Sequence, residues 1–234
     1  MSVTASIRAA DGSVREMPLS QLTSTLVLSA VPWRVIRSHR GQRHLPGVYW
    51  SSTTAAHVVY ESRLELARLL LADADREIVA IAAQPFLVRD ADRRHVPDFL
   101  FRRADESVLM VNVKPADRLK DVRVAGALAW AGRVFAGRGW EHEIWSGTDP
   151  QVLANVRFLA GYRRAALLDP ADLAAAVALC SREARMTVTG AEASLRGSGV
   201  GEPRPVVLHL LWSGALRADL ARPLTADTEL EVVS

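Results

Sequence analysis

Three short segments carry the residue types that metal-dependent phosphate chemistry needs. They are Glu65, the pair Pro97-Asp98 and the triplet Asn112-Val113-Lys114. Mg²⁺ prefers oxygen ligands, and one or two carboxylates together with a substrate phosphate can hold it. A lysine beside them supplies a point charge for the phosphate or orients an attacking water. These residue types favour hydrolysis of a phosphodiester, provided that the fold brings the three segments together.

Two stretches of predicted strand carry the second and third segments. Residues 96–102 and 108–114 are rich in apolar and β-branched side chains, as is typical of strands. Polar residues around Asp105 separate them by a short turn, so we expect a β-hairpin. Antiparallel pairing about that centre sets Asp98 opposite Asn112, give or take one residue of register.

The other two residues are expected to reach the same place from different elements. Alternation along the second strand puts Lys114 on the face that carries the asparagine. Glu65 lies in residues 58–72, where apolar side chains recur at helical spacing. Glu61 lies one turn earlier on the same side, so either glutamate is a candidate metal ligand. Arg68, one turn later, offers Glu65 the simpler role of an ion-pair partner.

The motifs around these residues resemble those of the PD-(D/E)xK nuclease superfamily, and more narrowly those of the TnsA-like endonuclease subunits of heteromeric transposases. The resemblance rests on four motifs in the expected order and approximate spacing, at residues 60–65 (YESRLE), 84–86 (QPF), 95–99 (HVPDF) and 111–115 (VNVKP). It covers most of the chain. It implies a restriction-endonuclease-like fold, in which a mixed sheet is flanked by helices.

The resemblance assigns a role to each candidate residue. It implies that Glu65 is the helical acid, Asp98 the central metal ligand and Lys114 the catalytic lysine. Asn112 occupies a position where the superfamily commonly has Asp or Glu and where TnsA-like proteins can have Gln. We therefore predict a catalytic set of these four residues, with Mg²⁺ held by Glu65, Asp98 and Asn112 and with Mn²⁺ as a substitute. The amide leaves the number of metal ions open.

The resemblance also implies a functional setting. It indicates a Mg²⁺-dependent endodeoxyribonuclease that cuts one strand at transposon ends as a subunit of a heteromeric transposase. The partners that it implies are the DNA, an integrase-like transposase subunit that cuts and joins the other strand, and an ATPase regulator. Two alternatives stay open. One is a stand-alone restriction or repair endonuclease of the same fold, and the other is a catalytically decayed DNA-binding or assembly subunit.

Basic residues gather where they suit contact with a phosphate backbone. Arg37, Arg40 and Arg43 precede the first core helix, and Arg94 lies just before the strand of Asp98. The planar guanidinium of arginine matches phosphate oxygens well. We predict that these four residues contact DNA. The simpler alternatives are a solvated loop for the first three and a charged sheet edge for the fourth.

Composition and element order predict the organisation of the chain. Its 234 residues are 49% hydrophobic, which allows a substantial core, and its net charge is only +3. Strands alternate with helices, so we expect the α/β class. We place a nuclease domain, with an N-terminal hairpin around Asp11-Gly12 and the basic arm, over residues 1–168. In residues 169–234, three predicted helices and a hairpin favour a winged-helix-like domain. Its third helix, residues 203–212, is too apolar to be a strong reader of DNA bases, which favours protein contact or packing against the core.

Other function classes receive little support. The single cysteine, Cys180, excludes a disulfide framework within the chain and suits a reducing cytoplasm. There is no Walker phosphate loop, and the glycine-rich residues 196–201 lack the strand that a dinucleotide site requires. No apolar run approaches membrane-spanning length, and the N-terminus lacks a signal-peptide core. We therefore expect a cytoplasmic protein without a membrane partner.

The remaining polar residues of interest are expected to have structural roles. Gln84 lies between two apolar segments, where a side-chain amide commonly satisfies buried backbone groups. His95, His142 and His209 are scattered without the spacing of metal ligands, which predicts structural or surface roles.

Overall fold

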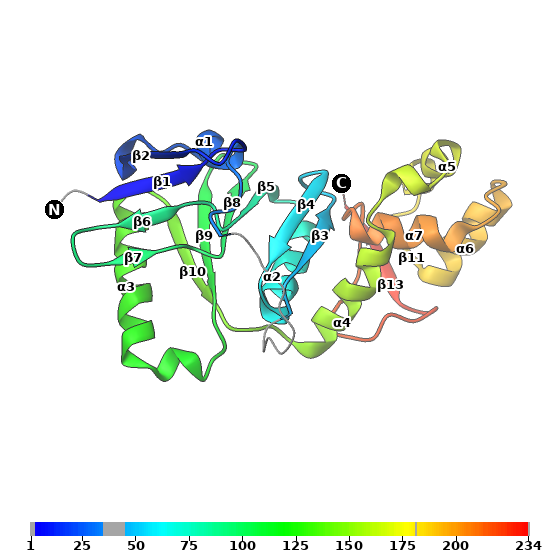
Figure 1. Cartoon of the computed structure of the whole chain (residues 1–234). Helices are drawn as coiled ribbons and strands as arrows, with labels where there is room; N and C mark the ends of the chain where they lie inside the picture. Colours follow the sequence, from blue (N-terminus) through cyan, green and yellow to red (C-terminus); the bar gives the residue numbers. More distant parts are fainter. Residues whose placement is uncertain (1–2, 35–44, 181, 234) are drawn as a thin grey trace. The chain divides into compact units, whose positions relative to one another are not determined.

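The computed structural model describes residues 3–34, 45–180 and 182–233. Contacts divide the chain into two compact units. The first consists of Met1–Asp73 and Glu77–Gly147, and the second of Ala74–Arg76 and Thr148–Ser234. Both units combine helices with strands (Figure 1), so the predicted α/β class is confirmed.

One four-stranded sheet of the first unit is built around the N-terminal hairpin. Its order is β2 (Val14–Pro18), β1 (Thr4–Arg8), β6 (Leu87–Arg89) and β7 (Arg94–His95). The predicted hairpin is confirmed, and Gly12 in its turn adopts a φ of +86° that glycine tolerates without strain. The short helices η1 (Leu19–Gln21) and α1 (Ser24–Leu28) follow.

A second four-stranded sheet of the same unit carries the predicted catalytic segments. Its order is β10 (Glu141–Trp145), β9 (Val108–Val113), β8 (Phe99–Arg103) and β5 (Ile78–Ala83). β10 runs parallel to β9, whereas β9, β8 and β5 are antiparallel neighbours. Phe99 pairs with Val111, and the same register sets Asp98 opposite Asn112, as predicted.

The helix that carries Glu65 starts later than the sequence predicts. α2 spans Arg63–Ala74, and the stretch before it forms β4 (Ala56–Tyr60), which pairs with β3 (Gly47–Ser51). The prediction that residues 58–60 are helical is therefore wrong. This stretch contains two β-branched valines that favour a strand, and β3 supplies a pairing partner that a local pattern does not reveal.

Asp73, near the end of α2, anchors the β3–β4 hairpin to the helix. Its buried carboxylate accepts hydrogen bonds from the hydroxyls of Tyr49, Ser51 and Ser52. The backbone N–H groups of Ser52 and Thr53 donate to it as well. Burial alone raises the pKa of Asp73, but these hydrogen bonds outweigh burial and lower the pKa. The anchor fixes the helix against the hairpin that precedes it.

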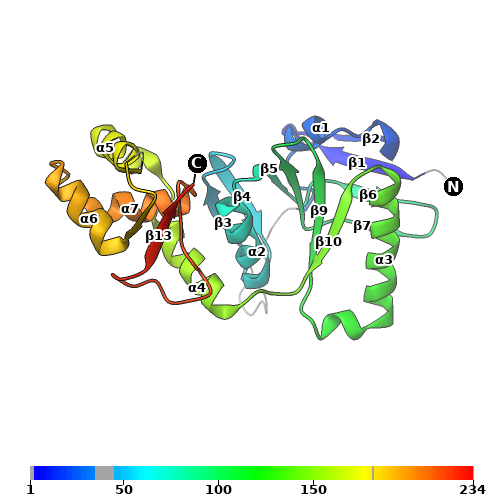
Figure 2. The ribbon, with the colours of Figure 1, turned by 180° about the vertical axis from the view of Figure 1, so that it is seen from behind.

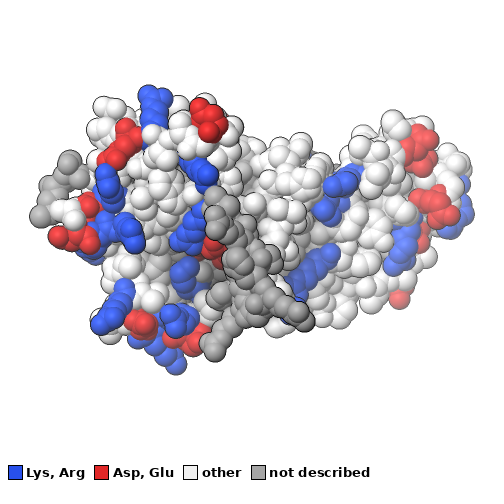
Figure 3. All heavy atoms as spheres, in the orientation of Figure 1, with Lys and Arg blue, Asp and Glu red and all other residues white. Residues whose placement is uncertain are grey.

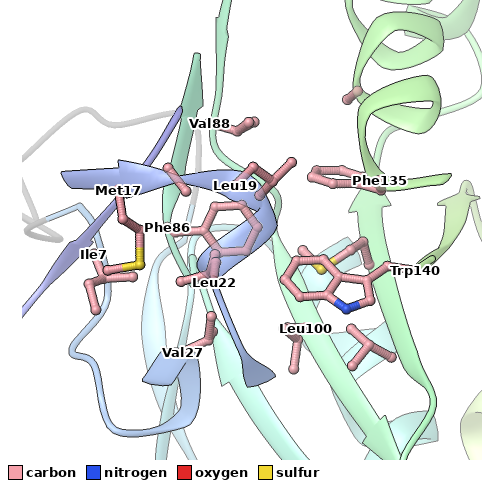
Figure 4. Close-up of a cluster of buried hydrophobic side chains, with 14 of the residues drawn as sticks. Ile7, Met17, Leu19, Leu22, Val27, Phe86, Val88, Leu100, Phe135 and Trp140 are labelled. Carbon is pink, nitrogen blue, oxygen red and sulfur yellow. The ribbon is translucent and has the colours of Figure 1, made fainter. Parts of the chain in front are cut away.

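Helix α3 (Val122–Gly137) covers one face of the second sheet. It begins where the side chain of Asp121 accepts hydrogen bonds from two backbone N–H groups of the first turn. It lies alongside β10 in both views (Figures 1 and 2). Its buried side chains join those of β8, β9 and the N-terminal sheet in one apolar cluster (Figure 4). The cluster includes Met17, Phe86, Leu100, Met110, Trp130, Phe135 and Trp140. This packing fixes the strands whose ends carry the candidate residues.

The second unit places helices around a small antiparallel sheet. Its helices are α4 (Pro150–Leu159), η3 (Ala160–Tyr162), η4 (Ala165–Leu167), α5 (Pro170–Cys180), α6 (Val188–Gly197) and α7 (Pro203–Trp212). Its strands have the order β11 (Arg185–Thr187), β13 (Glu229–Val232) and β12 (Leu216–Arg217). The helices predicted after residue 169 and the terminal hairpin are present, and α7 has the predicted bounds.

The boundary predicted at residue 169 lies inside this second unit. Helix α4 belongs to the unit because Asn155 donates hydrogen bonds to the carbonyl oxygens of Leu220 and Arg222, at 2.9 and 2.7 Å. His209 of α7 makes a 2.8 Å hydrogen bond through Nδ1 to the carbonyl oxygen of Tyr162. These contacts join distant parts of the chain, so a composition shift along the sequence does not reveal them.

Candidate active site

Glu65 is held rigidly in the first turn of α2. Its side chain is only 8% exposed. Its Oε2 accepts the N–H of Glu61 at 2.8 Å, and its Oε1 accepts the hydroxyl of Ser62 at 3.2 Å. The hydroxyl oxygen of Ser62 in turn accepts the N–H of Glu65 at 3.1 Å. This Ser-x-x-Glu arrangement resembles a capping box, so Glu65 also stabilises the start of its helix.

The electrostatic surroundings of Glu65 disfavour its charge. Burial, and next the negative charge of Asp98, raise the pKa of Glu65 to about 7. Hydrogen bonds from Glu61 and Ser62 act in the opposite direction but do not compensate. The two acids therefore lie near enough to repel each other, and a cation near both would relieve the repulsion.

Asp98 and Lys114 meet at the ends of β8 and β9. Asp98 is 6% exposed, and its Oδ2 accepts the N–H of Val113 at 2.7 Å. The ammonium of Lys114 lies 3.1 Å from the same oxygen and also donates to the carbonyl of Val113 at 2.9 Å. The side chain of Lys114 is one-third exposed, so its charge faces solvent as well as the carboxylate. The predicted convergence of these two residues is confirmed.

Asn112 lies opposite Asp98 in the hairpin, but its side chain is engaged elsewhere. It is fully buried, and its Oδ1 lies 3.1 Å from Nε2 of His95 and 3.0 Å from Nε2 of His142. Its Nδ2 has no hydrogen-bond partner among the residues that the structure describes. The asparagine oxygen that was expected to reach the metal is therefore occupied by two imidazole rings.

Strand alternation places the side chain of Asn112 on the face of the central sheet that α3 covers. His142 on β10 lies on the face of the sheet that α3 covers, where its ring packs edge-on against Phe135. Glu143, the next residue of β10, faces the other way and pairs with Arg68 of α2 at 2.8 Å. Asn112 shares the side of His142, whereas α2 packs on the opposite side.

The arginine that follows Glu65 does not pair with it. The guanidinium of Arg68 binds Glu143 and stacks over the ring of Phe101, with 4.8 Å to the ring centroid. The simpler role proposed for Glu65, as partner of Arg68, is therefore not realised. Glu61, the alternative ligand, forms an ion pair with Arg34 at 2.8 Å.

Gln84 links the chain before the site to Asp98. Its side-chain oxygen accepts the N–H of Arg34 at 3.1 Å, which confirms its predicted role towards backbone groups. Its own N–H donates to the carbonyl of Asp98 at 2.8 Å, and its carbonyl accepts the N–H of Trp33 at 2.9 Å. Gln84 does so with a φ of +46°, which is strained for a residue with a side chain. No sequence signal indicates that strain.

Sequence reasoning did not place His95 and His142 at the site. They are far apart along the chain, and their spacing is typical of no motif. Only the hairpin register and the parallel pairing of β10 with β9 bring both rings to Asn112. The motif that begins at His95 was quoted for its aspartate rather than for its histidine.

Exposed basic side chains lie on elements that precede β8 and follow β9 along the chain. The predicted DNA contacts Arg37, Arg40 and Arg43 lie outside the described residues. Arg94 is exposed on β7, next to His95. Exposed basic residues also follow β9, namely Arg118 and Lys120 of η2 (Arg118–Lys120) and Arg123 of α3, and none of these three forms an ion pair within the described part of the chain. Figure 3 shows Lys and Arg side chains spread over the first unit.

The donor set suits a hard cation better than a transition metal. Among the described residues, no group of three or more His, Cys, Asp or Glu side chains is arranged around a common point that suits a metal. Glu65 and Asp98 offer carboxylate oxygens, and the repulsion between their charges favours a cation. Mg²⁺ needs no more protein ligands than these, because it keeps waters and binds substrate phosphate.

Comparisons with known proteins add no assignment. No protein-family model matches the chain, and no curated protein matches it. In the described ranges, none of the helices combines the length and the apolar character needed to cross a bilayer. Function must therefore be inferred from the site itself.

Proposed function

We propose that this chain is a Mg²⁺-dependent endodeoxyribonuclease with Glu65, Asp98 and Lys114 at its active site. The observation that carries the proposal is the contact of Lys114 with one buried acid, Asp98, whose charge acts on a second buried acid, Glu65. The ammonium of Lys114 lies 3.1 Å from Asp98 Oδ2, and burial together with the charge of Asp98 raises the pKa of Glu65 to about 7. A structural ion pair would not require the second, uncompensated acid.

Each residue has a definite part in this proposal. Glu65 and Asp98 would hold Mg²⁺, which supplies a more acidic water and stabilises the leaving oxygen when it is bound. Val113 N–H and Lys114 fix the Asp98 carboxylate by donating to Oδ2, leaving Oδ1 for the ion. Lys114 offers its charge to the scissile phosphate from its solvent-facing side. We leave Asn112 out of the metal shell, because its oxygen already binds two imidazoles.

The arrangement of the first unit supports a restriction-endonuclease-like core. Its central sheet is mixed, with β10 parallel to β9 and the remaining neighbours antiparallel. α2 packs on one face through Arg68, and α3 packs on the other through Phe135. Asp98 lies just before β8 and Lys114 just after β9, whereas Glu65 lies in the first turn of α2.

The second unit supports a winged-helix-like domain with a modified use. From α5 onward its order is helix, strand, helix, helix, strand, strand, and its three strands form one antiparallel sheet. A winged helix that reads DNA exposes its third helix to the groove. Here residues 206–212 of α7 are all buried, and α7 packs against α4. This favours packing within the unit over base reading.

The transposition setting rests on the motifs of the sequence. In that setting the chain cuts one strand at transposon ends together with an integrase-like transposase and an ATPase regulator. The exposed cations Arg94, Arg118, Lys120 and Arg123 suit a DNA backbone beside the active site. A stand-alone restriction or repair nuclease has the same active site. An assembly subunit without activity would instead retain the fold and lack cleavage.

Cleavage by matched aspartate variants tests the proposal. The chain is combined with an integrase-like transposase, DNA carrying the transposon ends, and Mg²⁺, and breaks are mapped on both strands. We expect Asp98→Ala to reduce cutting of one strand by at least about 100-fold, the scale for losing one transition-state contact. Asp92→Ala removes an exposed acid from the nearby β6–β7 loop and should cut like the wild type.

The outcomes separate the three functions. Unchanged cleavage by Asp98→Ala contradicts the proposed site. Efficient cutting of ordinary DNA by the chain alone favours the stand-alone nuclease. If the wild-type complex assembles but the strand that the transposase leaves intact is not cut, the assembly subunit is favoured.

A further inference from the structure

Two histidines from different sheets both contact one buried asparagine behind the proposed active site. His95 belongs to β7 of the N-terminal sheet, whereas Asn112 and His142 belong to neighbouring strands of the central sheet. Both Nε2 atoms lie within 3.1 Å of the same asparagine oxygen. The three side chains therefore join the two sheets of the first unit at a single atom.

The position of this cluster along the chain connects it to the catalytic residues. His95 lies three residues before Asp98, and the intervening segment contains only Val96 and Pro97. Asn112 lies two residues before Lys114 on β9. The bond from His95 to Asn112 therefore ties the segment that leads into Asp98 to the strand that leads into Lys114.

The ring of His142 is held in place from its other side. It packs edge-on against Phe135, with 5.5 Å between ring centroids. A Cβ at Gly132 of α3 would stand only 2.8 Å from Nδ1 of His142, so glycine is what allows the ring to lie against the helix. Burial lowers the pKa of both His95 and His142, which favours the neutral ring with one N–H. Because α3 holds the His142 ring from behind, the ring limits where the side chain of Asn112 can lie.

We propose that His95 and His142 are positioning residues of the nuclease, which hold Asn112 so that Asp98 and Lys114 keep their contact. The proposal rests on the proposed function. It assigns Asn112 to the support of the active site rather than to the metal shell. Groups that orient metal ligands in this way commonly affect metal affinity and activity by about 10- to 100-fold.

Paired histidine variants provide the first test. His95→Leu and His142→Leu remove the Nε2–H group, whereas His95→Gln and His142→Gln keep an N–H donor at a similar distance from the backbone. We expect each leucine variant to lower kcat and raise the Mg²⁺ concentration for half-maximal rate by about 10-fold or more, with KM for DNA little changed. Each glutamine variant should recover most of that loss. Leucine variants that cut within twofold of the wild type would overturn the proposal.

Substitution of Asn112 separates support from metal binding. Asn112→Asp keeps an oxygen acceptor for both rings, and Asn112→Leu does not. If Asn112 supports the active site, Asn112→Leu should cut DNA more slowly than the wild type. Asn112→Asp should then need the same Mg²⁺ concentration for half-maximal rate as the wild type. A marked fall in that concentration for Asn112→Asp would mean that residue 112 is a metal ligand, which would overturn the proposal.

Two glycines of α3 test whether the close packing of this helix against the His142 ring matters. Gly132→Ala pushes a methyl group against the ring, whereas a Cβ at Gly126 on the same helix meets nothing within 4 Å. We expect Gly132→Ala to lower cleavage towards the level of His142→Leu and Gly126→Ala to leave it unchanged. Equal cleavage by both alanine variants would contradict a fixed ring.

Nuclear magnetic resonance of the imidazole nitrogens tests the cluster without any cleavage. Because both rings contact one oxygen, both should carry their proton on Nε2 in the wild type at neutral pH. Asn112→Leu should change the Nε2 signals of His95 and His142 and leave that of His209 unaltered. Different tautomers in the two wild-type rings would overturn the proposal. A wild type that shows the expected tautomers but never cuts DNA would instead contradict the proposed function.

Discussion

Replacing Glu65 with Gln should stabilise the folded chain above pH 7 and change its stability little near pH 4. Burial and the charge of Asp98 raise the pKa of Glu65 from its usual 4.5 to about 7. The folded state therefore binds this proton more tightly than the unfolded state does. Stability from this group is fully present below pH 4.5 and is lost as the pH rises through 7.

The expected size follows from the same pKa shift. At about 1.4 kcal/mol per pKa unit, the wild type loses about 3 kcal/mol of stability at this residue between pH 4 and pH 8. Solvent screening does not reduce the figure much, because Glu65 is 8% exposed. Glutamine has a similar shape, keeps an oxygen for the N–H of Glu61 and has no charge to bury. The variant should therefore exceed the wild type by about 3 kcal/mol near pH 8.

Urea unfolding without divalent metal measures this difference. Tryptophan fluorescence is followed near pH 4, 6 and 8 for the wild type and Glu65→Gln. Glu106→Gln, at an exposed position in the β8–β9 turn, controls for the loss of one negative charge. In a second series at pH 8, Mg²⁺ should stabilise the wild type more than Glu65→Gln, because in the proposed function the ion binds the folded state through this carboxylate.

Two results would refute the reasoning. If the difference in unfolding free energy between Glu65→Gln and the wild type is the same at pH 4 and pH 8, ionisation of Glu65 does not destabilise the folded chain. If Mg²⁺ stabilises both proteins equally at pH 8, Glu65 is not a ligand of the ion.

Two further predictions concern the anchor of α2 and the exposed cations. Asp73→Ala leaves buried hydroxyl and N–H donors of the β3–β4 hairpin without an acceptor, so thermal unfolding should show a loss of about 3–5 kcal/mol, and a loss below about 1 kcal/mol would contradict the anchoring role. Arg118→Ala and Lys120→Ala should each reduce by about 1 the slope of log affinity for DNA against log salt concentration. An unchanged slope for both variants would mean that the DNA backbone does not contact Arg118 and Lys120. Arg204→Ala in the second unit removes the same charge and is the control.

Local signals were sufficient for the hairpin that carries Asp98 and Asn112. A short polar turn lies between two apolar, β-branched stretches, so few registers are available, and the register with Asp98 opposite Asn112 is the one observed. The helix of Glu65 was harder to delimit. Val58 and Val59 fit a helical pattern and a strand pattern equally well, and what decides between them is the pairing with β3, which directly precedes β4 in a hairpin that helical spacing alone does not indicate.

The sequence by itself determined which acids and which lysine are available, in what order they occur and how the hairpin pairs. Only the tertiary structure decided their surroundings. Burial and the approach of Asp98 set the pKa of Glu65, and Arg68 was drawn away by Glu143 on a distant strand. The partners of Asn112 were decided in the same way, by the packing of separate strands. Spacing along a chain specifies local geometry, whereas solvation and charge at a site depend on residues that only folding brings near.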